Sequence, residues 1–198
     1  MEPTPEQAIA ETQQWIQTVV IGMNLCPFAR KVVQDQTIRY QTTLTTDPET
    51  LFQAVAAELT LLTETPRERI ETSILIHPNV LTDFLEYNDF LGAVDELIAQ
   101  QGLAGVIQVA SFHPDYQFAG TRADSVENYT NRSPYPMLHF LREVSITEVS
   151  DDPEFLEQIP ERNQLTLRDV GRKAMLAKLK AIREQAAAQR SNPGGGGT

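Results

Sequence analysis

The sequence predicts an α/β fold of the α+β sandwich type, with a sheet of three to five strands and a helical C-terminal part. Short β-rich runs lie at residues 37–44, 72–76 and 106–112, and longer segments with helical spacing of apolar residues separate them. Strands separated by helices imply crossover connections, with the helices mainly on one face of the sheet. Ferredoxin-like βαβ elements are one way to build such connections.

The individual helices are predicted by capping residues that precede apolar residues at helical spacing. These signals predict helices over residues 4–22, from 47 to about 62, 84–99 (as one or two helices), 133–143, a short one from 152, and 166–189. We expect residues 1–189 to form a single globular domain and the glycine-rich residues 190–198 to form a flexible tail.

Composition limits the classes of partner. The chain has 198 residues, and 41% of them are hydrophobic, which is enough for one sizeable core. A formal net charge of −11 argues against nucleic acid and anionic membranes as partners, because both require a basic surface. The single cysteine, Cys26, excludes an internal disulfide and fits a cytoplasmic location. The sequence does not predict an oligomeric state.

The segment from Ser111 to Glu143 concentrates histidines, arginines, carboxylates and aromatic residues after the third predicted strand. Ionisable groups on a long loop at a strand end commonly form a chemical site. His113 would be a general base or a metal ligand there, with Asp115 orienting its ring. The alternative is a histidine that only forms hydrogen bonds within the loop.

Cys26 follows the first predicted helix and precedes Pro27, which can begin a new helical turn. Unpaired backbone N–H groups at such a turn favour the thiolate, whereas the C-terminal end of the preceding helix opposes it. Cys26 would then be a nucleophile or a metal ligand. The alternative is a buried cysteine that packs as a small hydrophobic residue.

His139 and Glu143 are four residues apart in a predicted helix, so both would lie on one helix face. Such a pair can complete an acid/base couple or a metal site. Together with Cys26 and His113, His139 would give mixed sulfur and nitrogen ligation, which suits zinc or iron. The chain has no established metal-binding motif.

A second group of residues would bind substrate. Guanidinium groups suit carboxylate or phosphate, and the start of the predicted helix at Ser133 is a natural anion site. The predicted ligand is therefore a small anionic molecule. The alternative is that Arg132 pairs with Asp124 or Glu127 and holds the loop in place. The candidate substrate-binding residues are Arg122, Asn128, Asn131 and Arg132.

Four longer motifs stand out: NLCPFA at 24–29, FHPDYQFA at 112–119, NYTNRSPYP at 128–136 and IPERN at 159–163. With these motifs the chain resembles, over nearly its whole length, a bacterial family known as domain of unknown function 1415. The resemblance implies a bacterial, cytoplasmic protein. It implies no particular activity, cofactor or catalytic residue.

Three functions remain open at this point. The first is a small thiol- or metal-dependent enzyme, a hydrolase or transferase, that acts on a small anionic substrate. The second is a non-catalytic metal-binding protein that uses Cys26, His113 and His139. The third is a protein-interaction module built on residues 111–143, whose aromatic side chains either anchor a partner or fold back onto the loop. The first two require the thiol and both imidazoles to lie together.

Overall fold

A computed structural model describes residues 2–148 and 153–191. These residues form one four-stranded sheet, with strands in the order β1-β2-β4-β3. β1 and β2 are parallel, and the pairs β2–β4 and β3–β4 are antiparallel. The strands are β1 Ile38–Thr42, β2 Thr72–Ile76, β3 Ile107–Phe112 and β4 Met137–Arg142.

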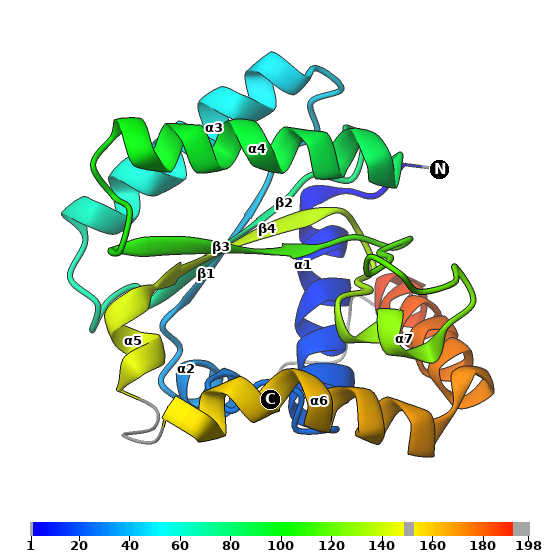
Figure 1. Ribbon diagram of the computed structural model, residues 1–198. Coiled ribbons are helices and arrows are strands. Elements are labelled where there is room, and N and C mark those ends of the chain that lie inside the picture. The colour runs from blue at the N-terminus through cyan, green and yellow to red at the C-terminus, as the bar shows by residue number, and fades with distance from the viewer. Residues whose placement is uncertain (1, 149–152, 192–198) are drawn as a thin grey trace, which may run out of the picture.

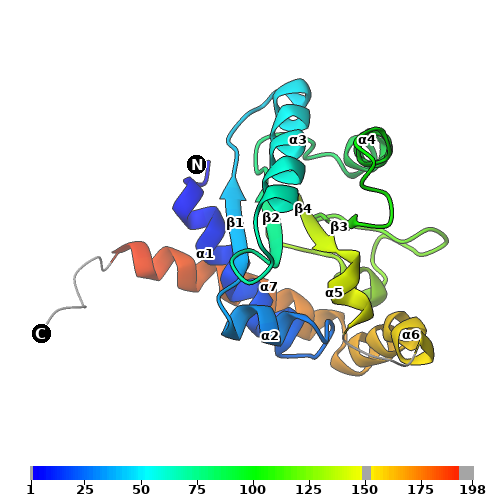
Figure 2. The same cartoon turned by 90° about the vertical axis from the view of Figure 1, so that its left-hand side faces the viewer.

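The α+β class, the number of strands and the helical C-terminal part are confirmed. The expectation of helices mainly on one face needs correction, because helices cover both faces of the sheet (Figures 1 and 2). A βαβ unit is present, since α3 (Pro48–Glu64) connects the parallel strands β1 and β2. Its two strands are direct neighbours, which differs from the split βαβ unit of ferredoxin-like folds.

One face of the sheet packs against α3 and α4 (Phe84–Gln100). Alternate residues of the strands turn toward these helices, as the two-residue period of a strand requires. A buried polar cluster sits at the β1 end of this layer, where Glu58 of α3 accepts hydrogen bonds from Arg39 and Ser73. The apolar core of this layer includes Leu51, Val55, Leu59, Leu62, Leu75, Tyr87, Val94, Ile107, Leu138 and Phe140.

The opposite face carries the N- and C-terminal helices and their connections (Figure 1). Its core includes Trp15, Val19, Leu25, Ile74, Ile76, Tyr129, Met137, Leu167, Met175 and Ile182. The elements here are α1 Pro5–Trp15, the π-helix η1 Ile16–Ile21, α2 Ala29–Gln34, the 3₁₀ helix η2 Val126–Thr130, α5 Glu143–Thr147, α6 Pro153–Val170 and α7 Arg172–Ser191.

The predicted helix starts at Thr4 and Asp47 are confirmed by their caps. Thr4 accepts a hydrogen bond from the Gln7 backbone N–H at 3.3 Å, and Asp47 accepts one from that of Thr50 at 2.9 Å. The long helix predicted over 166–189 is wrong in its boundaries. Gly171, with a φ of +78°, ends α6, and α7 begins one residue later.

The helix predicted over 133–143 is wrong, because residues Met137–Arg142 form the inner strand β4. β4 pairs with both β2 and β3, and it has fully buried side chains on both faces, Met137 on one and Leu138 and Phe140 on the other. A strand buried on both faces reads as a continuous apolar run, which periodicity does not separate from a short helix. His139 therefore lies in a strand and not in the helix that was expected.

Two remaining predictions fall partly outside the described residues. Position 152, where a short helix was expected to begin, is not described, although α6 begins at Pro153. Of the tail predicted over 190–198, residues 190 and 191 belong to α7 and the others lie outside the described part. Within the described part, none of the helices combines the length and apolar character needed to cross a bilayer.

Candidate functional site

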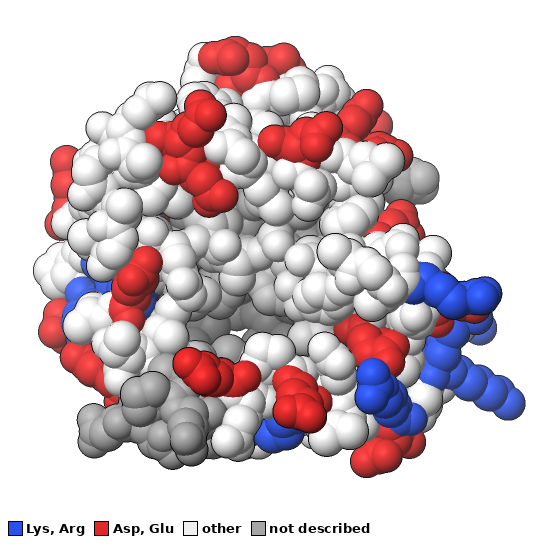
Figure 3. Space-filling view, in the orientation of Figure 1, with Lys and Arg blue, Asp and Glu red and all other residues white. Residues whose placement is uncertain are grey.

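A cavity of about 680 Å³ lies on the sheet face opposite α3 and α4, between the sheet, η1, α2 and α5. Figure 3 shows the hollow in the surface, with acidic side chains around it. Its size falls in the range of small-molecule sites. Most of its walls are apolar side chains: Trp15, Ile16, Val20, Phe28, Val32, Ile38, Ile74, Phe112, Met137, Leu141 and Ile146.

His139 and Thr72 are polar residues on the sheet side of this cavity, contributed by neighbouring strands. The Thr72 hydroxyl lies 2.7 Å from His139 Nε2 and 2.6 Å from the carbonyl oxygen of Phe140. A hydroxyl has one proton, and a carbonyl can only accept, so Thr72 donates to Phe140. His139 must therefore donate its Nε2–H to Thr72, which leaves Nδ1 as the unprotonated ring nitrogen.

The His139 imidazole is uncharged near neutral pH. Burial lowers its pKa to about 4, because the surrounding apolar walls disfavour the cation. Nδ1 has no hydrogen-bond partner among the described residues, and His139 lines the cavity. His139 therefore supplies a neutral, unoccupied hydrogen-bond acceptor to the wall of the cavity.

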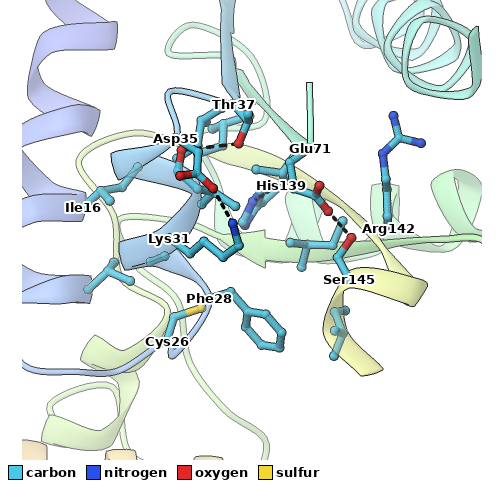
Figure 4. Close-up of a pocket in the computed structure, with 18 of the residues that line it drawn as sticks. Ile16, Cys26, Phe28, Lys31, Asp35, Thr37, Glu71, His139, Arg142 and Ser145 are labelled. Atoms are coloured by element: carbon cyan, nitrogen blue, oxygen red, sulfur yellow. Dashed lines mark hydrogen bonds and ion pairs between the residues drawn. The ribbon is translucent and has the colours of Figure 1, made fainter. Parts of the chain in front are cut away.

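Cys26 lines the same cavity, so the structure brings Cys26 and His139 to one site (Figure 4). The chain reaches Cys26 from η1 through Asn24, which has a φ of +53°. The backbone N–H groups of Phe28 and Ala29 lower the pKa of the thiol, but burial has the larger effect and raises it overall. Cys26 is therefore a thiol at rest, and α2 begins at Ala29 rather than at Pro27.

Charged side chains at the cavity's edge are engaged with one another. Lys31 pairs with Asp35, and Arg67 forms ion pairs with Glu71 and Glu148. Ser145 of α5 donates a hydrogen bond to Glu71 (Figure 4). Arg142 also lines the cavity, but its guanidinium Nη2 donates to the carbonyl oxygens of Leu62, Thr65 and Ile70.

His113 lies on the other side of the sheet. Its ring packs against Phe84 and Tyr87 of α4, with centroid distances of 5.5 and 5.2 Å, and its side chain is fully buried. Nε2 lies 3.3 Å from the carbonyl oxygen of Leu81, and Nδ1 accepts a hydrogen bond from the backbone N–H of Asp115 at 3.0 Å. Both ring nitrogens are thus occupied, and the exposed Asp115 orients the ring through its main chain.

The prediction that Cys26, His113 and His139 share one site is wrong, because side chains one residue apart in register face opposite sides of a sheet. His139 in β4 turns toward the cavity with Met137, whereas His113 follows Phe112 and turns toward α4. Glu143 begins α5 and is not part of the cavity wall. Within residues 2–148 and 153–191, no group of three or more histidine, cysteine and carboxylate side chains could hold zinc or iron.

The predicted substrate-binding residues hold the loop between β3 and β4. Asn128 is fully buried and forms three hydrogen bonds, to the Phe118 N–H, the Thr121 hydroxyl and the Arg122 carbonyl. Asn131 donates to the carbonyl of Ser111 at 3.0 Å.

The two arginines of the loop also lie outside the cavity wall. Arg132 donates to the carbonyls of Tyr116 and Ala123 and stacks on Tyr129, with its guanidinium carbon 4.8 Å from the ring centre. It therefore pins the loop, but through backbone carbonyls rather than through the carboxylates that we considered. The exposed Arg122 pairs with Asp124.

The aromatic residues of this loop fold back onto the protein. Tyr116 packs between Phe84 and Phe118, with centroid distances of 5.1 and 5.0 Å. Tyr129 is buried, and the Tyr135 hydroxyl donates to Glu11 of α1 at 2.8 Å. These contacts match the interpretation in which the aromatic side chains tether the loop.

Several cavity residues were missed by sequence reasoning, above all Thr72, Phe28, Arg67 and Glu71. Thr72 sits in a correctly predicted strand, but its contact with His139 depends on strand order and register. The motif at 24–29 was the available signal for Phe28, which lies two residues after Cys26.

The comparisons with known proteins agree with the resemblance noted from the motifs. No curated protein and no solved structure shows significant similarity to this chain. A family model described as "Protein of unknown function (DUF1415)" matches residues 7–177, which include the four motifs and every residue that lines the cavity. The chain belongs to the DUF1415 family.

Proposed function

We propose that this protein binds a small, predominantly apolar molecule in the cavity between the sheet, α2 and α5. The observation that carries the proposal is a hollow of about 680 Å³ with apolar walls and an uncharged imidazole whose Nδ1 is unoccupied. Binding pockets typically combine apolar walls with a few polar groups that orient the ligand. His139 and Cys26 supply the polar groups here.

An NMR titration with 1-methylnaphthalene tests this proposal. We expect saturable shifts of the methyl signals of Ile16, Ile74 and Met137, which line the cavity. The methyl groups of Val55 and Leu59, in the core on the other face, serve as the internal control and should not move. Equal shifts in both cores, or none in the cavity, would exclude the site.

A second candidate is an enzyme, a hydrolase or transferase, that uses the same cavity. The supporting observation is that a thiol and a neutral imidazole share one largely apolar site. The Cys26 sulfur would attack an acyl carbon as the leaving group departs, and His139 Nδ1 would accept the thiol proton. Transfer of the acyl group from Cys26 to water or another acceptor would complete the reaction.

Release of nitrophenolate from p-nitrophenyl acetate separates this enzyme from a simple binding protein. A burst that is stoichiometric with protein should occur in the wild type, slow in His139→Phe and disappear in Cys26→Ala. Reaction of Cys26→Ala at the wild-type rate would exclude thiol catalysis. Binding of 1-methylnaphthalene does not depend on this outcome, so the two candidate functions are tested independently.

The setting that we propose is the bacterial cytoplasm. The supporting points are the bacterial family that the four motifs resemble and the single cysteine, which fits a reducing compartment.

A further inference from the structure

We propose that the ligand is an uncharged molecule with an apolar ring or chain and one hydrogen-bond donor, such as a hydroxyl group, that binds His139 Nδ1. The inference rests on the proposed function and adds the chemical class of the ligand. It differs from the small anionic molecule that the arginines of the 111–143 segment had led us to expect.

The first argument is the hydrogen-bonding capacity of His139. Thr72 accepts a hydrogen bond from Nε2–H at 2.7 Å and donates its own to the carbonyl oxygen of Phe140, so the strand pairing fixes the tautomer. Nδ1 can then only accept a hydrogen bond. A ligand donor satisfies this nitrogen, whereas a ligand that offers only acceptors would leave it unpaired.

The second argument is the charge around the cavity. Its lining has three cationic side chains, Lys31, Arg67 and Arg142, and four carboxylates, Asp35, Glu68, Glu71 and Glu148. Lys31 and Arg67 are already paired with carboxylates. The carboxylates at this edge would repel a ligand anion, so an uncharged ligand is favoured.

The positive charge of Arg142 does not change this conclusion. Its Nη2 is held by three backbone carbonyls, one in the last turn of α3 and two in the connection from α3 to β2. Figure 4 shows its guanidinium turned away from Cys26 and Phe28. An anion that bound Nη2 would have to break these hydrogen bonds and leave the three carbonyl oxygens without this donor.

The third argument is the shape and composition of the walls. Trp15 and Phe112 pack edge to face, with ring centres 5.3 Å apart, and Phe112 also contacts the His139 ring at 6.3 Å. Phe28 lines the cavity from the turn that carries Cys26. An apolar ring system can therefore pack against aromatic side chains while its hydroxyl group reaches His139.

Three naphthalene probes that differ in one substituent test the inference: 1-naphthol, 1-methylnaphthalene and 1-naphthoate. NMR titrations should show 1-naphthol binding about tenfold tighter than 1-methylnaphthalene, which corresponds to one hydrogen bond to an otherwise unpaired acceptor. 1-Naphthoate should bind more weakly than both. The ¹⁵N signal of His139 Nδ1 should move on addition of 1-naphthol, and little on addition of 1-methylnaphthalene.

Two variants connect the preference to the tautomer. His139→Phe keeps a ring of similar size without an acceptor, so both neutral probes should then bind equally. Thr72→Val keeps the shape of the side chain but no longer fixes the tautomer, so the ratio of the 1-naphthol affinity to the 1-methylnaphthalene affinity should fall toward one. Melting temperatures confirm that each variant is folded.

The outcomes separate this inference from the proposed function. Binding of 1-methylnaphthalene as tight as that of 1-naphthol, or tightest binding of 1-naphthoate, overturns the inference and leaves the cavity as a binding site. A 1-naphthol preference that persists in His139→Phe also overturns it. If none of the three probes binds in the cavity, both the inference and the proposed function fail.

Discussion

The side-chain amide of Asn163 donates a hydrogen bond to the backbone carbonyl of Leu25 at 2.8 Å, across a separation of 138 residues. The neighbouring Arg162 donates to the carbonyl of Asn24 at 3.0 Å. The motifs at 24–29 and 159–163 therefore meet, and α6 holds the turn that presents Cys26 to the cavity. The position of the thiol thus depends on contacts with the C-terminal half of the chain.

We predict that Asn163→Ala loosens this turn. The side chain is 4% exposed, so its loss leaves the Leu25 carbonyl without its partner and should lower the free energy of unfolding by about 1–3 kcal/mol. Alkylation of Cys26 by iodoacetamide should become faster, because the thiol loses part of its enclosure. The matched control is Gln158→Ala on the exposed surface of α6, which should change neither property. An unchanged alkylation rate in folded Asn163→Ala would contradict the proposed support of the turn.

We predict that any side chain at Gly22 destabilises the protein, because this residue lies against the backbone of the π-helix η1 that precedes it. A Cβ at this position would lie 2.4 Å from the carbonyl oxygen of Thr18, and backbone atoms cannot move aside as a flexible side chain can. We expect Gly22→Ala to cost about 1–3 kcal/mol in denaturant unfolding. Gly92→Ala in α4 is the control, because its Cβ would meet no atom within 4 Å, and it should stabilise the protein by about 0.5–1 kcal/mol. Equal effects of the two changes would show that the close approach at Gly22 is unimportant.

Local signals predicted most of the fold, and non-local pairing explains what they missed. The strand at 72–76 and the helix starts at Asp47 and Thr4 were correct, because apolar runs and capping residues act within a few positions. The strand order β1-β2-β4-β3 is set by contacts between distant segments. Strand order and register together bring Thr72 beside His139, 67 residues away. The alternation of side chains along the chain turns His113 to the opposite face.

For the candidate site too, the sequence indicated residue types correctly but not the contacts between distant segments. Cys26 and His139 were singled out by residue type, and both line the cavity. Asn128 and Arg132 were singled out on the same grounds, yet both hold a loop. Amide and guanidinium groups satisfy backbone carbonyls as readily as they bind ligands, so residue type and sequence position do not separate the two roles.

Substitutions of Asn128 and Arg122, both in the loop between β3 and β4, should have different effects on stability. Asn128→Ala removes three buried hydrogen bonds and should lower the free energy of unfolding by about 2–4 kcal/mol. Arg122→Ala removes only a surface ion pair with Asp124, so its free energy of unfolding should stay close to that of the wild type. Urea unfolding of both variants checks this pair. Similar stability of the two would mean that Asn128 does not organise the loop.

The buried histidine His77 should make the protein sensitive to acid. Nδ1 lies 3.0 Å from the carbonyl oxygen of Val80 and must donate to it, so Nε2 is unprotonated, and it has no partner. Burial, together with a smaller effect of the neighbouring His113, lowers the pKa of His77 to about 4. The unfolded chain, with an ordinary pKa near 6.5, therefore binds a proton more readily than the native protein between these two values.

The free energy of unfolding should therefore decrease as the pH falls. The contribution of neutral His77 to stability is fully present above about pH 6.5 and is lost as the pH falls toward about 4, where the loss reaches about 3 kcal/mol. The variant His77→Asn places an amide near the position of Nδ1 and has no titratable group. Urea unfolding from pH 7 to pH 4 should show a smaller decline in the free energy of unfolding for this variant than for the wild type. Parallel pH profiles of the two proteins would assign the acid sensitivity to groups other than His77.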